Sequence, residues 1–291
     1  MAAAAPIDPL CRILTAWQSD IGPSWKFRLC DPFWRLYLNE QAGAEVVFPG
    51  GIHRLLPGRL HLLPAWGEFT ARCQGRAGIQ HYLHLDLADW GRGLFTVPIA
   101  LPPDPVACAA MRTLCDGNSA WTAAGRLRAR AFALHALSSA VATLAPAAQD
   151  QLVAGISGDD PVAVVRRFVE EHLAEDLDLG RLARACGLSP RHLGDVFHGR
   201  TGRTPMAYVR ERRVANAAEL LLSGAVPIED VAQRVGFVNR HHFSRIFARL
   251  VGCGPASYRR TRRPVSDIAA ALAPGAAVRP RVGAAPVRAV R

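Results

Sequence analysis

Lysine is almost absent from the 291-residue chain: Lys26 is the only one, and arginine carries nearly all of the positive charge behind a net charge of +11. A strongly basic chain favours a polyanionic partner such as a nucleic acid. Arginine-rich composition also arises from genome base composition, so its distribution matters. Residues 159–263 hold 18 arginines against 12 acidic residues, whereas residues 1–158 hold 13 basic residues against 11 acidic ones. The excess positive charge therefore lies in the C-terminal half.

Paired cysteines and long apolar runs are also missing. The seven cysteines are scattered and form no Cys-x-x-Cys pair, which argues against a disulfide framework and against a zinc cluster. The most apolar stretch, residues 131–148, is interrupted by His135, Ser138 and Thr143, and the N-terminus lacks the basic and apolar regions of a signal peptide. We therefore expect a cytoplasmic protein with no membrane partner, no cofactor and no bound metal.

The N-terminal half contains short apolar or alternating runs that are separated by glycine and proline. The runs are Trp34–Leu38, Glu45–Phe48, Leu60–Leu63 and Gln80–Leu87. This pattern is typical of an antiparallel β-sandwich or small barrel. We place an N-terminal arm at residues 1–24 and the β-domain at residues 25–105, where four prolines between 98 and 105 mark a boundary.

Residues 106–150 change to a helical period. Leu127, Leu134 and Val141 are seven residues apart, as are Leu137 and Leu144 on the adjoining row. Such a seam either packs against the β-domain or joins two copies of the chain, and two or three heptads do not decide between these alternatives. We therefore predict a dimerisation or connector region here. Residues 264–291 lack aromatic residues and are predicted to form a disordered basic tail.

A motif in the C-terminal half occurs twice. Residues 179–208 recur at 228–258, and the offset changes from 49 to 50 at the turn, so the second copy has one extra turn residue. The matched pairs include Leu182 and Val231, Ala183 and Ala232, Gly187 and Gly236, Val196 and Ile246, Phe197 and Phe247, Gly202 and Gly252, Pro205 and Pro255, and Tyr208 and Tyr258. Repetition at this period indicates a duplicated supersecondary unit.

Each copy has the signals of a helix, a glycine turn and a second helix. In the first copy, Asp178 and Ser189 are suited to cap the two helices and Gly187 permits the turn. Gly236 and Asn239 take the corresponding places in the second copy. Both copies are therefore predicted helix-turn-helix units.

A third helix is predicted between the two units, from Thr204-Pro205 to about Leu222. At about 1.5 Å per residue its length is roughly 28 Å. Successive major-groove segments on one face of B-DNA lie about 34 Å apart. A rigid helix of this length suits two recognition helices that enter adjacent turns of one duplex.

The two motifs and their spacing resemble the DNA-binding domain of the AraC/XylS family of transcription regulators. The resemblance is carried by residues 182–193 and 231–247, closed by Gly252, Pro255 and Tyr258-Arg259. In that family a cupin-like sensing domain commonly precedes the DNA-binding domain, and residues 32–37, 56–58 and 81–86 are similar to such domains. The resemblance thus implies an α+β chain: an N-terminal antiparallel β cupin-like barrel with following helices, and an all-α DNA-binding domain at 159–263 with two helix-turn-helix units joined by a long helix.

The resemblance also places the residues that contact DNA. Those expected at base edges are Arg191, Gly194, Asp195, Arg240, His241, Ser244 and Arg245. Those expected at phosphates are Ser189, Asn239, Thr204 and Arg203. Arginine bonds guanine through two atoms, and the first unit has glycine and aspartate in place of long polar side chains. The second unit, with two such arginines, is therefore expected to contribute more binding free energy than the first, or else the first reads a narrow sequence through Arg191.

The predicted strand Gln80–Leu87 suggests an effector pocket. Strand geometry places Leu83, Leu85 and Leu87 on one face and Gln80, Tyr82 and His84 on the other. The polar row, with Arg35 or Tyr37 nearby, suits a small polar ligand, although a half-exposed face gives the same pattern. His53, His61, His81 and His84 are single residues without the clustered ligands that a metal site requires.

The sequence therefore predicts a DNA-binding transcription regulator, and not an enzyme. Its expected partners are double-stranded DNA, a small-molecule effector, a second copy of the chain and, for an activator, RNA polymerase. One alternative is a cupin-type metalloenzyme fused to a DNA-binding module. Another is a regulator whose N-terminal domain only dimerises and never binds a ligand.

Overall fold

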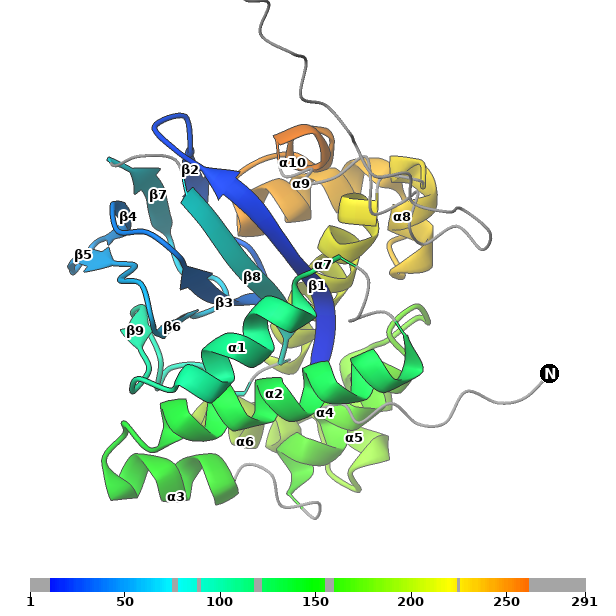
Figure 1. Ribbon diagram of the computed structural model, residues 1–291. Helices are drawn as coiled ribbons and strands as arrows, with labels where there is room; N and C mark the ends of the chain where they lie inside the picture. The colour runs from blue at the N-terminus through cyan, green and yellow to red at the C-terminus, as the bar shows by residue number, and fades with distance from the viewer. Residues whose placement is uncertain are drawn as a thin grey trace, which may run out of the picture.

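The computed structural model describes residues 11–74, 78–87, 90–117, 122–154, 160–223 and 226–261. Two antiparallel β-sheets are followed by helices, so the α+β fold class is confirmed (Figure 1). The predicted tail, residues 264–291, and the first ten residues lie outside the described residues.

The nine described strands form a sandwich of two sheets rather than a closed barrel. The first sheet has the order β1 (Arg12–Ile21), β8 (Gly78–Asp86), β3 (Trp34–Asn39), β6 (Leu60–Leu63) and β9 (Ile99–Ala100). The second has the order β2 (Lys26–Leu29), β7 (Phe69–Cys73), β4 (Ala44–Phe48) and β5 (Gly51–Arg54). The first sheet thus begins at β1, inside the segment predicted as an N-terminal arm.

Strand β8 confirms the predicted division of its faces. Leu83 and Leu85 are buried on the side covered by helices, whereas Tyr82 is buried between the two sheets. Its partner β3 is buried along its whole length, because both faces are covered. The first sheet therefore lies between two hydrophobic cores, one beneath the helices and one between the two sheets.

Residues 105–154 form three helices: α1 (Pro105–Leu114), α2 (Ala123–Val141) and α3 (Pro146–Ala154). Figure 1 shows α1 and α2 lying across the first sheet. The side of α2 that packs against this core is formed mainly by small residues with Phe132 and Leu137. Leu127 and Leu134, by contrast, are 69% and 45% exposed. Part of the heptad seam therefore packs against the sandwich, and part faces outward.

The C-terminal domain contains only helices among its described residues. They are α4 (Pro161–Glu171), α5 (Leu179–Ala185), α6 (Pro190–Thr201), α7 (Pro205–Ser223), α8 (Ile228–Arg234), α9 (Arg240–Val251) and α10 (Pro255–Thr261). α7 is the long helix predicted between the two repeats. Its 19 residues separate α6 from α8, so one helix connects the two halves of the domain.

A buried arginine on α7 joins the C-terminal domain to the sandwich. The Nη1 and Nη2 atoms of Arg212 donate to the two carboxylate oxygens of Asp86, each at 2.8 Å. Its Nη2 also donates to Glu170 of α4 at 3.0 Å. Burial lowers the pKa of Arg212, but the two carboxylates outweigh it and raise that pKa well above its ordinary value. Arg212 is therefore charged and holds three elements together.

Arg12, at the start of β1, extends this ion cluster. Its Nη2 lies 2.8 Å from Asp86 and 2.9 Å from Glu219 of α7, and it donates to Asn216 of the same helix. Nearby, Arg92 reaches Glu211 of α7 at 2.7 Å. The side chains of α7 that contact the sandwich domain thus extend along the helix, from Glu211 and Arg212 to Asn216 and Glu219.

A second contact between the domains is apolar. Trp66, in the loop before β7, packs against the core of the second repeat, where Phe243 and Phe247 are buried. Its φ of 61° is unusual for a residue with a bulky side chain, which marks a position held by its surroundings. The backbone N–H of Trp66 donates to the carbonyl of Asp31 at 2.8 Å, and the thiol of Cys30 contacts the carbonyl of Leu250.

We predict that Asp86→Asn weakens the contact between the two domains and lowers the free energy of unfolding. The substitution removes the negative charge that pairs with Arg12 and Arg212, and it leaves the buried Arg212 with Glu170 as its remaining carboxylate partner. Breaking a buried ion pair on one side costs about 3 kcal/mol or more. Urea unfolding followed by tryptophan fluorescence should show this loss.

The matched control is Arg28→Gln. It breaks the Arg28–Glu68 pair, whose side chains are 71% and 60% exposed, and exposed pairs contribute about 1 kcal/mol at most. Equal losses in the two variants would contradict a special role for the buried cluster.

Candidate DNA-binding surface and interior pocket

The first repeat folds as a helix-turn-helix formed by α5 and α6. The Asp178 carboxylate accepts from the backbone N–H of Arg181 and begins α5, and the Ser189 hydroxyl accepts from that of His192 and begins α6. Gly187 has a φ of 69°, which favours glycine, and so permits the tight turn between the helices. Both predicted caps are confirmed.

The second repeat has the same construction in α8 and α9. The Asn239 side chain accepts from the backbone N–H of His242 at 2.8 Å, as predicted. The turn residue Gly236 has a φ of 84°, and a Cβ there would lie 2.8 Å from the carbonyl oxygen of Leu173. Glycine is therefore required at this turn for conformation and for space.

Matched residues of the two repeats occupy equivalent cores. Leu193, Phe197 and Tyr208 are fully buried in the first, and the equivalent Phe243, Phe247 and Tyr258 are fully buried in the second. These contacts fix each second helix by its inner face and leave its outer face free.

The outer faces carry the residues predicted at base edges. Arg191 and Asp195 are exposed on α6, and Arg240, His241 and Arg245 are exposed on α9. Gly194 and Ser244 are half-buried. Within the described residues, none of the three arginines forms an ion pair. Their guanidinium groups are therefore available to an external acceptor.

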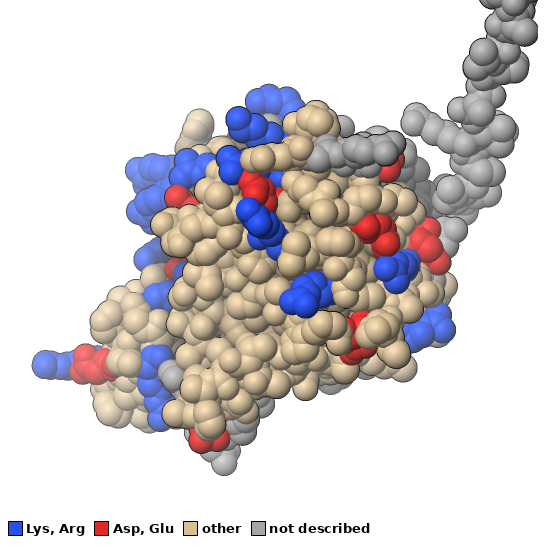
Figure 2. Space-filling model, turned by 60° about the vertical axis from the view of Figure 1, so that its left-hand side comes forward, with Lys and Arg blue, Asp and Glu red and all other residues tan. Residues whose placement is uncertain are grey.

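The residues predicted at phosphates differ in availability. Ser189, Thr204 and Asn239 lie at the N-termini of α6, α7 and α9, where backbone N–H groups point outward. Arg203 is instead only 14% exposed and pairs with Glu211, which also binds Arg92 of the sandwich domain. Glu211 therefore competes with any phosphate for Arg203. In Figure 2, basic side chains gather toward the left and upper edges, and the middle of this face is largely uncharged.

The five residues predicted to bind an effector meet on one face of the first sheet. Arg35 is paired across the strands with His84, Tyr37 with Tyr82, and Gln80 with Asn39. Their shared face contributes Tyr37 and Tyr82 to the core between the sheets. The structure therefore places the predicted set together, inside the sandwich.

Three further polar residues line this interior and were not predicted. Asp31 is buried and forms an ion pair with Arg35. The Asn39 side chain accepts from Gln80, but its own amide nitrogen and the Tyr82 hydroxyl find no hydrogen-bond partner among the described residues. Burial raises the pKa of Tyr82 well above its ordinary value, so its hydroxyl keeps its proton. His61 of β6 is also buried.

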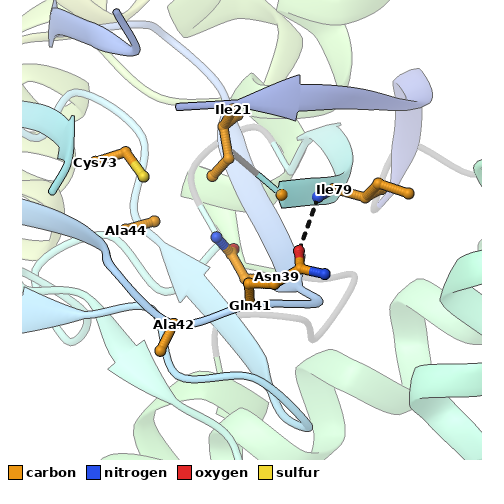
Figure 3. Close-up of a pocket in the computed structure, with 8 residues that line it drawn as sticks. Ile21, Asn39, Gln41, Ala42, Ala44, Cys73 and Ile79 are labelled. Atoms are coloured by element: carbon orange, nitrogen blue, oxygen red, sulfur yellow. Dashed lines mark hydrogen bonds between the residues drawn. The ribbon is translucent and has the colours of Figure 1, made fainter. Parts of the chain in front are cut away.

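One end of the sandwich has a shallow hollow beside Asn39 that has no room for a water molecule (Figure 3). Ile21, Ala44 and Cys73 line it, and the Gln41 side chain accepts from the backbone N–H of Ile79 at its rim. A larger groove of about 620 Å³ lies outside the sandwich, between α1 and α2, where Ala110 and Phe132 line it. The hollow inside the sandwich is therefore the smaller of the two.

A family model described as a helix-turn-helix domain matches residues 182–261. The MmsAB operon regulatory protein of Pseudomonas aeruginosa is 35% identical over 96 residues, which are 33% of this chain and 31% of that protein. The arabinose operon regulatory protein of Escherichia coli is 29% identical over 116 residues, which are 39% of this chain and 40% of that protein.

Residues 182–261 thus form a helix-turn-helix domain of the kind found in AraC/XylS-type regulatory proteins. The predicted resemblance is thereby confirmed for this domain, and the relatives are named as regulatory proteins. The chain spans about a third of the length of the curated relatives that it matches.

The whole fold also has a solved counterpart. ToxT from Vibrio cholerae matches 89% of this chain and 100% of its own, with a TM-score of 0.59 and 11% sequence identity. At this identity the likeness concerns the fold alone, and it supports a cupin-like sheet domain followed by the helical AraC-type domain.

The described residues contain no group of three or more His, Cys, Asp or Glu residues suited to hold a metal ion. One ring nitrogen of His61 lies 2.9 Å from His53 and the other 2.9 Å from the Leu56 carbonyl, so both are engaged. Burial lowers the pKa of His61 to about 4, which keeps it neutral. No helix in the described part of the chain has the length and apolarity that crossing a bilayer requires.

Proposed function

We propose that this chain is a sequence-specific DNA-binding transcription regulator of the AraC/XylS type that reads two adjacent major-groove segments with α6 and α9. The observation that carries the proposal is the pair of helix-turn-helix units joined by α7, each with an exposed polar outer face. A 19-residue helix is roughly 28 Å long, which is close to the spacing of successive groove segments at about 34 Å.

The two recognition helices have different chemistry. α9 offers Arg240, His241, Ser244 and Arg245, and each arginine can bond guanine O6 and N7 together. α6 offers Arg191 beside Asp195, which accepts from cytosine N4 but repels phosphate. Ser189, Thr204, Asn239 and Arg203 position the backbone. We infer that the α9 half of the binding site contributes more free energy than the α6 half.

This asymmetry has a direct test in a gel-shift titration on a duplex selected from genomic DNA. The double variant Arg240→Ala, Arg245→Ala should weaken specific binding more than Arg191→Ala does. Each lost arginine–guanine pair is worth about 1–3 kcal/mol, so the double variant should lose about 30-fold or more in affinity.

The matched control is Arg54→Ala, which removes an exposed arginine of β5 in the sandwich domain and should leave affinity nearly unchanged. A larger loss for Arg191→Ala than for the double variant would refute the inferred order.

We further propose that a small-molecule effector binds inside the sandwich, against Arg35, Tyr37, Gln80, Tyr82 and His84. Support comes from the buried polar face of the sheet. The Asn39 amide nitrogen and the Tyr82 hydroxyl on this face have no hydrogen-bond partner among the described residues, so both can donate a hydrogen bond to a ligand. ToxT has been solved with an unsaturated fatty acid bound, but at 10% identity this does not identify an effector for this chain. The small hollow implies that the sheets move apart when a ligand enters.

Two connections lead from this interior to the DNA-binding domain. Arg35 pairs with Asp31, whose carbonyl holds Trp66 against the second helix-turn-helix core. Strand β8 carries Tyr82 and ends at Asp86, the partner of Arg212. A ligand that displaces either element acts on a contact with the C-terminal domain, which is the physical basis for effector control.

Tyr82→Phe is the sharpest test of the pocket. Removing a buried hydroxyl without a partner should leave the melting temperature of the free protein unchanged or slightly higher. In a thermal-shift screen of sugars, aromatic acids and other metabolites, a ligand at 100 times its dissociation constant stabilises by about 2.7 kcal/mol. Such a ligand should stabilise the wild type more than the variant, and equal shifts would place its site elsewhere.

We also propose a homodimer that forms through α2. Leu127 and Leu134 lie one heptad apart and are exposed, next to the groove between α1 and α2.

The variant Leu127→Ser, Leu134→Ser should sediment as a monomer at concentrations where the wild type is a dimer. Arg54→Ala serves again as the control, and a dimer that survives the double substitution would exclude this face.

The alternative of a cupin-type metalloenzyme fused to a DNA-binding module lacks a clustered set of ligands among the described residues. The regulator remains our proposal, with RNA polymerase as a further partner if it activates transcription.

A further inference from the structure

Val238 is the most exposed large hydrophobic residue in the described part of the chain, at 93%. It lies in the turn between α8 and α9, one residue before the N-cap Asn239. Its neighbour Phe237 is buried against His242 and Phe243. The two apolar residues of this turn therefore have opposite environments, and only Phe237 contributes to the core.

Valine is an unexpected residue for this place. Turn positions favour Gly, Asn, Asp, Ser and Pro, whereas β-branched residues favour strands. Val238 forms no part of a core cluster, so the fold gains nothing from its methyl groups. A local rule that is broken without a gain to the fold is typical of a functional position.

The residue is also specific to the second unit. In the first unit, Leu188 is followed directly by the N-cap Ser189, whereas Val238 stands between Phe237 and Asn239 in the second. It is the extra turn residue detected in the repeat. Any contact that it makes is therefore added to α9 and has no counterpart at α6.

We propose that the Val238 side chain contacts the 5-methyl group of a thymine at the edge of the DNA segment that α9 reads. This inference rests on the proposed DNA-binding function. The N-terminal end of a recognition helix approaches the base edges, and Val238 lies at that end beside the exposed Arg240. Thymine alone presents a methyl group in the major groove, so an aliphatic side chain there selects thymine.

The test replaces each thymine of a selected duplex, in turn, with deoxyuridine, which lacks only the methyl group. Affinity is measured for the full-length wild type and for Val238→Ala. One replacement should weaken the wild type about fourfold, the effect of about 0.8 kcal/mol for one buried methylene-sized group. Val238→Ala should bind the unmodified duplex more weakly and show no further loss at that thymine.

Val97→Ala is the matched control, since Val97 is an exposed valine in the N-terminal domain. This variant should keep the full deoxyuridine effect. The inference is overturned if Val238→Ala keeps the effect as well, or if no thymine of the duplex gives one. In both cases specific binding by the wild type would leave the proposed function standing, whereas absence of specific binding would refute the function itself.

Discussion

The ion cluster around Arg212 is the interaction on which the arrangement of the molecule depends. Arg212 belongs to α7, Asp86 to the sandwich, and Glu170 to the first part of the helical domain. A buried guanidinium without its carboxylates is strongly unfavourable, so these three elements are stable only together. Helix α7, which separates α6 from α9, is thereby fixed against the domain that precedes it.

The recognition surface depends on a different principle. Aromatic residues of each unit, such as Phe197 and Phe247, are buried on the inner face, and this leaves the outer face under no packing constraint. Arg240 and Arg245 can therefore differ from their counterparts in the first unit, and Val238 can be added to the second, without disturbing the fold. Duplicated units with equivalent cores can in this way acquire unequal surfaces.

Much of the fold could be predicted because its signals are local. The caps Ser189 and Asn239 and the turns at Gly187 and Gly236 act within a few residues, and the alternation of β8 reports its two covered faces. β1 was missed because its alternation is interrupted: the register shifts between Ile13 and Thr15, and Thr15 and Ala16 are buried in succession. β5 is largely exposed, and β9 has two residues, so neither carries a readable pattern.

The candidate pocket was predictable in part for the same reason. Tyr82 and His84 lie on one face of one strand, whereas the pairing of Asp31 with Arg35 depends on a loop whose path the sequence does not reveal. The partners Asp86 and Arg212 are 126 positions apart, and no local pattern selects one arginine among so many. The contacts between the two domains could therefore not be predicted from the sequence and are visible only in the structure.

Both domains contribute side chains to the ion cluster around Arg212, and this limits how the two domains can be exchanged between regulators. A helical domain grafted onto another sandwich domain keeps Arg212 and Glu170 but leaves Asp86 and Arg12 behind. The sandwich domain from which it was taken keeps a buried carboxylate without its guanidinium. Successful chimeras would have to carry both sides of the cluster, so the two domains are expected to be inherited as one unit.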